Sequence, residues 1–295
     1  MRRGLSIAKA TALEILSEPL SLLLLLTALA ISTLAPAFHY HQFGEPSRMA
    51  RDAGLSALFT CATVFAVAGA IKTIRSEIES GTIQMALARS VSRRTFFLSK
   101  VLGVFFAYCA FALIVVATSL TIVFGAEAGG RLAAKTGDVA RLWGPALAAG
   151  VGMAIVPLAI GAFMNRIANC RFALTVFRSA IVFSFVLLGL VGWLDGAMAA
   201  RLLPASVLIM AYSAMFLAVA AALAVKMRAG AASAAVGALA IVSLPMVGNY
   251  YLSDQLRGGG TIPWLYTASA VAAALFAIAA FLVLGIHFLS ERDIS

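Results

Sequence analysis

The chain has 295 residues, of which 62% are hydrophobic and 12% are charged, and its mean hydropathy is +1.01. Soluble globular domains are about 45–50% apolar and about 25% charged, so this composition excludes an ordinary soluble enzyme, a disordered chain and a secreted disulfide scaffold. The three cysteines are odd in number and stand in or beside apolar runs, which favours small buried hydrophobic residues. The sequence therefore predicts an all-α polytopic transmembrane bundle, with residues 1–295 forming a single domain.

The first 19 residues are predicted to form a short helix that lies in the inner membrane interface. Apolar residues such as Leu5 and Ile7 alternate there with charged residues such as Lys9 and Glu14, and Pro19 separates the stretch from the first long apolar run. Such a mixture suits a helix with basic residues directed toward anionic headgroups. A plain solvated tail is the alternative.

Eight apolar runs follow that are long enough to cross the hydrocarbon core, for which a helix needs about 20 residues. An even number of spans places both termini on the same side. The seventh run is rich in Gly and Ala and is interrupted by Pro245, so a total of six or seven spans, with re-entrant later segments, is the alternative. The runs are Leu20–Phe38, Leu55–Ile74, Val101–Phe124, Trp143–Asn165, Phe172–Trp193, Leu202–Val225, Ala231–Leu252 and Ile262–Leu289.

The distribution of charge predicts the orientation. With a cytoplasmic N-terminus, 15 of the 22 Lys and Arg residues lie on the cytoplasmic side, whereas the 12 acids divide evenly between the two sides. Because lysine and arginine are enriched in cytoplasmic loops, both termini are predicted to be cytoplasmic. The net charge of +10 is therefore a topology signal, and nucleic-acid binding is not needed to explain it.

The longest predicted cytoplasmic segment, residues 75–100, joins the second and third runs. Glu77 and Glu79 stand at the end of the second run. A short amphipathic helix is predicted over 82–88, with Ile83 and Leu87 on one face. Ser92 is a suitable N-cap for the helix that begins with Arg93 and continues into the third run. A short helix between two long spans has the shape needed to bind a groove on a cytoplasmic partner, and an ordinary solvated loop is the alternative.

The polar residues of this segment follow a recognisable pattern. Glu77, Glu79 and Gly81-Thr82-Ile83 are followed by Leu87, Val91-Ser92-Arg93, Phe96 or Phe97, Leu98, Lys100 and Gly103. This resembles the E-x-E-x-G-T-I/L and L-x-x-P-V/I-S-R-x-x-F-L-x-G-K-x-x-G patterns of ABC transporter permeases of the ABC-2 type. Ser90 and Ser99 stand where that family has Pro and Gly. The resemblance is close over about residues 44–103 and diffuse elsewhere.

The resemblance implies the transmembrane permease subunit of an ATP-driven exporter in the bacterial cytoplasmic (inner) membrane. Its partners would be a separate ABC ATPase subunit, a second permease subunit that is identical or homologous, and membrane lipid. The chain itself would be neither an enzyme nor a cofactor-binding protein. The coupling helix between the second and third spans would contact the ATPase, through Glu77, Glu79, Gly81, Thr82, Ile83, Leu87, Ser92 and Arg93.

Other chemistry has little support in the sequence. The nearest match to a phosphate-binding loop, over 129–136, has Ala134 in place of the second Gly. His39 and His41 lack a third ligand nearby, which favours an interfacial position over a metal site. Arg178 lies well inside a predicted span, where it can snorkel to the inner surface or contact substrate.

Two other functional classes remain as alternatives to the exporter. An ion-coupled secondary transporter would need a carboxylate or a broken helix at the midplane, and only Pro157 and Pro245 suggest a break. A membrane enzyme acting on lipids would need converging acids, histidines or a nucleophile–base pair, and the sequence suggests none.

Overall fold

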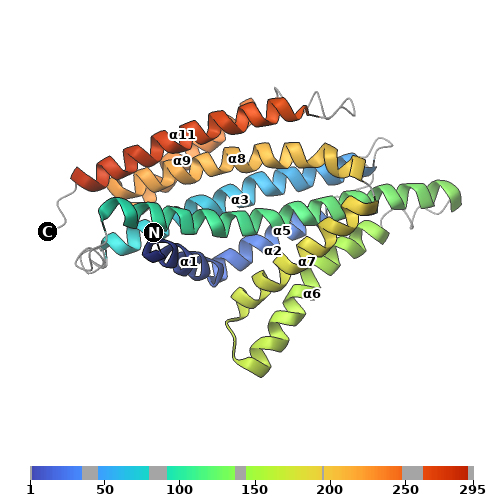
Figure 1. Ribbon diagram of the computed structural model, residues 1–295. Helices are drawn as coiled ribbons and strands as arrows, with labels where there is room; N and C mark the ends of the chain where they lie inside the picture. The colour runs from blue at the N-terminus through green and yellow to red at the C-terminus, as the bar shows by residue number, and fades with distance from the viewer. Residues whose placement is uncertain are drawn as a thin grey trace. The chain divides into compact units, whose positions relative to one another are not determined.

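The computed structural model of the chain describes residues 2–34, 46–79, 92–136, 144–194, 196–247 and 262–291. Nearly all of these residues are helical, and no strand occurs within these ranges (Figure 1). The predicted all-α class is therefore confirmed for the described part of the chain. The helices within it are α1 (Arg2–Leu16), α2 (Pro19–Leu34), α3 (Pro46–Glu79), α5 (Arg93–Thr136), α6 (Gly144–Ala168), α7 (Phe172–Leu194), α8 (Gly196–Lys226), α9 (Ala229–Val247) and α11 (Trp264–Glu291).

Six of the described helices are long and apolar enough to cross a membrane, and there are seven if the bent pair α1 and α2 counts as one span. Helices of this kind are those of a multi-pass membrane protein. The eight spans predicted from the sequence stay a prediction, because the first run (Leu20–Phe38) and the seventh run (Ala231–Leu252) extend beyond the described residues. α2 has 16 residues and is about 24 Å long, less than the hydrocarbon thickness of about 30 Å. The described apolar part of α9, Ala229–Ile241, is shorter still.

The chain divides into two compact units. The first unit takes its residues from Met1–Ile15, Thr63–Tyr108 and Val207–Ser295, and the second takes its residues from Leu16–Ala62 and Cys109–Ser206. Helices α3, α5 and α8 each contribute residues to both units. The single domain predicted for residues 1–295 stays a prediction.

In the first unit, α1 packs against the N-terminal half of α5. Ala8 and Thr11 are buried on the face of α1 that meets α5. Gly103 permits this close approach, because a Cβ atom there would lie 2.5 Å from the carbonyl oxygen of Ala8 and 2.7 Å from Cβ of Thr11. The N-terminal helix predicted from the sequence is present, with one face packed on protein and Leu5 61% exposed on another face.

In the second unit, α2 contacts both α6 and α7. α6 and α7 form a helical hairpin whose connection is Asn169, Cys170 and Arg171 (Figure 1). Asn169 adopts a left-handed backbone conformation with a φ of 49°, which asparagine tolerates better than most residues. Small residues allow the close approaches here, since Thr33 of α2 lies against Gly150 of α6.

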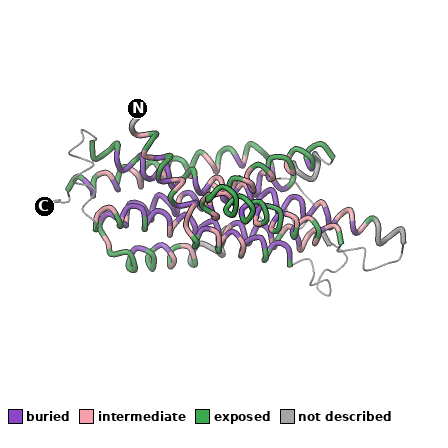
Figure 2. The backbone as a smooth tube through the Cα atoms, turned by 90° about the horizontal axis from the view of Figure 1, so that it is seen from below, coloured by how far each residue is buried: buried purple, intermediate pink, exposed green. Residues whose placement is uncertain are grey.

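Buried and exposed residues alternate along the helices, so that many of them have one packed side (Figure 2). The mean hydropathy of a helix does not indicate how much of that helix is buried. The most apolar windows of α5 and α11 have the same mean hydropathy of 2.5, yet 67% of the α5 window is buried and only 6% of the α11 window. Exposed apolar faces of this kind suit contact with lipid tails.

Candidate functional site

α3 ends, α5 begins and α8 turns into α9 at one end of the first unit (Figure 1). Polar side chains of these elements form hydrogen bonds and ion pairs there. We define the helix-end cluster as Arg75, Glu77 and Glu79 of α3 together with Ser92, Arg93 and Lys100 at the start of α5. These residues flank positions 80–91 on both sides. Each of them makes a hydrogen bond or an ion pair within the described residues.

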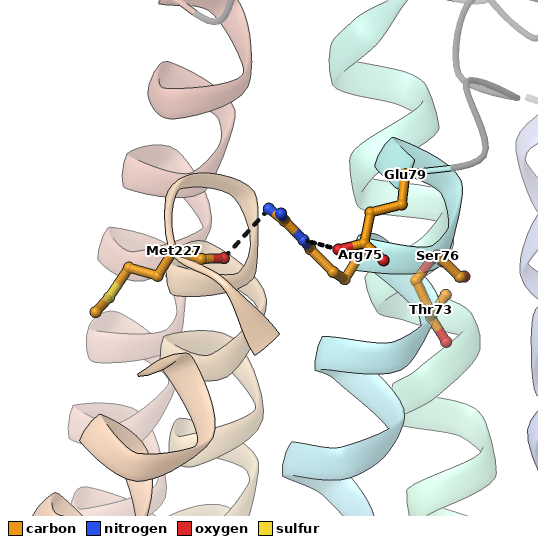
Figure 3. A network of polar contacts seen from close by, with 5 residues as sticks. All are labelled: Thr73, Arg75, Ser76, Glu79 and Met227. Carbon is orange, nitrogen blue, oxygen red and sulfur yellow. Dashed lines mark hydrogen bonds and ion pairs between the residues drawn. The ribbon is translucent and has the colours of Figure 1, made fainter. Parts of the chain in front are cut away.

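Arg75 connects α3 to the turn between α8 and α9. Its Nε atom lies 2.6 Å from Oε1 of Glu79, one turn further along α3, and its Nη1 atom donates to the carbonyl oxygen of Met227 at 3.3 Å (Figure 3). The Arg75 side chain is 16% exposed and that of Glu79 is 62% exposed. Because Glu79 and Met227 hold the guanidinium from two directions, the end of α3 is fixed to the α8–α9 turn.

Glu77 and Lys100 connect α3 to α5. Nζ of Lys100 lies 2.7 Å from Oε1 of Glu77, and the two side chains are only 10% and 24% exposed. The same ammonium lies 5.9 Å from the centre of the Phe96 ring. Removing one partner of a buried ion pair leaves the other charge uncompensated, which is strongly destabilising. This pair therefore sets the distance between the end of α3 and the start of α5.

The start of α5 is capped and tied to α11. Oγ of Ser92 accepts a hydrogen bond from the backbone N–H of Thr95 at 3.2 Å, and α5 begins at Arg93. The N-cap predicted for Ser92 is thus confirmed. Nη1 of Arg93 donates to the carbonyl oxygen of Ser290 in the last turn of α11 at 3.4 Å.

Aromatic packing joins α11 to the neighbouring helices at the same end. Phe97 of α5 is buried against Gly285, where a Cβ atom would lie 2.6 Å from Cζ of the ring. Nζ of Lys226, at the end of α8, lies 4.9 Å from the centre of the Phe288 ring. A cation over an aromatic face is held by the charge distribution of the ring. The last turns of α8 and α11 are therefore joined at the helix-end cluster.

The structure brings some of the predicted contact residues together and does not describe others. Glu77, Glu79, Ser92 and Arg93 all belong to the helix-end cluster. Gly81, Thr82, Ile83 and Leu87, together with the helix predicted over 82–88, lie outside the described residues. Both acids have partners within the chain, so the ATPase contact expected of them stays a prediction. Arg178 is exposed on α7 and is separate from this cluster in sequence and in unit.

Sequence reasoning did not identify the two partners of Arg75, which are Glu79 and Met227. The spacing of four residues between Arg75 and Glu79 is a signal that could have identified their ion pair. No sequence signal marks the carbonyl oxygen of Met227 as the second partner of Arg75. Within the described ranges no group of three or more His, Cys, Asp or Glu residues could hold a metal ion, and His39 and His41 lie outside those ranges.

Comparison with known proteins identifies a similar region without naming a function. A family model described as "Protein of unknown function (DUF2705)" matches residues 25–165. The matched region includes α3 and the start of α5, and with them the whole helix-end cluster. No curated protein matches the chain, and no solved structure matches it either.

Proposed function

We propose that the chain is the transmembrane permease subunit of an ATP-driven exporter of the ABC-2 type, in which a separate ATPase subunit hydrolyses the ATP. The observation that carries the proposal is the contact pattern of the motif residues. Glu77, Ser92, Lys100 and Gly103 lie 26 positions apart at most, and each makes a specific contact in the first unit. A solvated loop would not need fixed flanks of this kind.

Fixed flanks suit a segment that transmits movement. If an ATPase displaces residues 80–91, the Glu77–Lys100 pair makes α3 and α5 move together. Arg75 extends the connection to the α8–α9 turn, and Arg93 extends it to α11. Rigid elements joined in this way can convert a local displacement into rearrangement of the bundle.

The two acids have different parts in this proposal. Glu77 is 24% exposed and acts as a positioning residue through its pairing with Lys100. Glu79 is 62% exposed, so its carboxylate can meet a basic group of the ATPase while Arg75 holds its other side. Gly81, Thr82, Ile83 and Leu87 would complete the ATPase contact, and Ile83 and Leu87 would fill an apolar groove.

The proposed topology places both termini and the helix-end cluster on the cytoplasmic side of a bacterial inner membrane. It can be tested in a variant without the native cysteines Cys61, Cys109 and Cys170. A membrane-impermeant maleimide added to whole cells should label Arg131→Cys, at the far end of α5, and should not label Glu79→Cys. Both positions are well exposed, at 68% and 62%. The reverse labelling pattern would overturn the orientation.

Purification of the tagged full-length chain from its native host in mild detergent tests the function itself. A Walker-motif ATPase should co-purify in stoichiometric amount, and Glu79→Lys should reduce its recovery by about fivefold, the effect expected of one well-placed charge pair. Glu127→Lys is the control, because Glu127 also pairs with an arginine four residues away, at the far end of α5. Absence of an ATPase after gentle crosslinking would refute the exporter.

One observation favours the alternative of an ion-coupled secondary transporter. Glu77 and Lys100 form an ion pair whose side chains are only 24% and 10% exposed, and a buried pair of this kind can carry a coupling proton. The two functions differ in energy source. Substrate transport by the purified chain alone in proteoliposomes, driven by a proton gradient and abolished in Glu77→Gln, would establish the alternative.

A further inference from the structure

A pocket of about 420 Å³ opens between the end of α3 and the first turn of α9, both in the first unit. Its walls include Ala68, Ile71, Lys72 and Arg75 of α3, and Gly230 and Ser233 of α9. The side chains lining it change from apolar to cationic along α3. The Arg75 guanidinium reaches the carbonyl oxygen of Met227 beside the pocket (Figure 3).

The charges around the pocket favour an anion. Lys72 and Arg75 contribute two positive charges, and Glu79 contributes one negative charge that is engaged by Arg75. Arg228, in the turn directly before α9, adds a further positive charge next to the pocket. The two hydrogen bonds of Arg75 fix the plane of its guanidinium, and the remaining donors of that group are available for a planar contact with an oxyanion.

The apolar side of the pocket continues along exposed helix surface. Val64, Ala68 and Lys72 are spaced by four residues and so share one face of α3, with Val64 48% exposed. A cationic end followed by exposed apolar surface matches the two parts of a phospholipid, whose phosphate lies at the ends of the spans and whose chains lie beside them.

We propose that this pocket is a binding site for an anionic phospholipid, with Lys72 and Arg75 contacting the phosphate and the acyl chains lying along α3. A zwitterionic lipid would bring a positive headgroup charge toward Lys72, and a free phosphate ion would leave the apolar side without a function. The inference does not rest on the proposed ATPase partner, because the site would serve any protein that spans the membrane with these helices.

The glycines of α9 offer a way to close the pocket without changing its charge. A Cβ atom added at Gly230 or at Gly237 would meet no other atom within 4 Å. Gly230→Phe places a ring at the pocket wall, whereas Gly237→Phe places the same ring two turns further along α9. The second variant is therefore the matched control for the first. Lys9→Gln, an exposed position on α1, is the matched control for the loss of charge in Lys72→Gln.

The experiment measures the midpoint of thermal unfolding of the full-length chain in maltoside micelles while lipid is titrated in. Phosphatidylglycerol should raise the midpoint saturably, because a ligand that binds only the folded state stabilises it, and Lys72→Gln should need about tenfold more lipid for the same rise. Gly230→Phe should abolish the rise. Lys72→Arg, Lys9→Gln and Gly237→Phe should behave as the unchanged chain.

Three outcomes would overturn the site. An equal rise with phosphatidylcholine would show that the headgroup charge is not recognised. An equal rise with inorganic phosphate would show that the pocket binds a free anion. A loss in Gly237→Phe as large as that in Gly230→Phe would show that α9, and not the pocket, determines the response. If Gly230→Phe fails to fold, the comparison of Lys72→Gln with Lys9→Gln decides the question alone.

Discussion

Two regions rich in basic residues were assigned to the same side of the membrane, and they use their charges differently. In the helix-end cluster, Arg75, Arg93 and Lys100 each bond to a residue of another helix or turn. At the α6–α7 connection, Arg166 and Arg171 are exposed and make no ion pair with any described residue. The predicted topology places both regions in cytoplasmic segments, where basic residues are enriched.

The comparison separates two roles of a positive charge at a helix end. An exposed arginine at a short hairpin contributes only its positive charge to the orientation of the helices in the membrane. Any basic residue that is solvated by water and headgroups could contribute the same charge. Buried or bridging cations fix the distance between helices, so that their position and geometry matter. We therefore expect substitutions in the helix-end cluster to change stability, and equivalent substitutions at the α6–α7 connection to leave it nearly unchanged.

The largest effect is expected for Lys100→Met, which should lower the free energy of unfolding by about 3 kcal/mol because the Glu77 carboxylate, only 24% exposed, loses the ammonium that lies 2.7 Å away. Arg171→Met should change it by less than about 0.5 kcal/mol. Both are measured by denaturant unfolding in detergent. The double variant Glu77→Gln with Lys100→Met should cost less than the sum of the single changes. Additive effects would show that the two side chains do not interact.

The contact of α1 with α5 provides the next test. Gly103→Leu should destabilise the protein by about 2 kcal/mol, because the added side chain must displace Ala8 and Thr11. Gly152→Leu, in α6, is the control, since a Cβ atom there meets nothing within 4 Å. Limited proteolysis should also cleave α1 faster in Gly103→Leu. Equal unfolding midpoints for the two variants would refute the close approach.

A smaller effect is expected for Arg75→Gln, which breaks the hydrogen bond to Met227 and the pair with Glu79. The loss should be about 1.5 kcal/mol, the usual value for a hydrogen bond from a charged group. Hydrogen exchange should accelerate at the start of α9, which that bond fixes. Arg131→Gln is the control, because Arg131 is 68% exposed and its pair with Glu127 lies within one helix. Unchanged exchange at α9 in Arg75→Gln would show that the bridge is unimportant.

The sequence predicts the local features of the bundle better than the tertiary ones. Apolar runs identify helices, and the Ser92 cap follows from residues three positions apart. The Glu77–Lys100 pair joins residues 23 positions apart. No local sequence pattern predicts that the end of α3 meets the start of α5. The number of spans follows less directly from the sequence, because apolar composition does not show where a helix stops. The run predicted over Leu20–Phe38 is described as α2 as far as Leu34, and Phe38 lies outside the described residues.

The smallest effects are expected at the residues that directly precede α5 and α7. Ser92 precedes α5 and Arg171 precedes α7, and the carbonyl oxygen of each accepts the N–H four residues ahead. Only Ser92 adds a side-chain acceptor for a second N–H. Ser92→Ala should therefore cost about 1 kcal/mol, and Ser92→Asp should retain the cap.

The same reasoning predicts a gain in stability when a capping side chain is introduced before α7. Arg171→Ser should stabilise the protein by about 0.5 kcal/mol, since a hydroxyl at that position can accept an N–H of the first turn of α7. Hydrogen exchange at the first amides of α5 and α7 is the measurement, and it should accelerate in Ser92→Ala and slow in Arg171→Ser. Slower exchange at α7 together with unchanged membrane orientation would show that Arg171 contributes charge alone. A loss of stability in Arg171→Ser would instead reveal a structural contact and remove the contrast between the two regions.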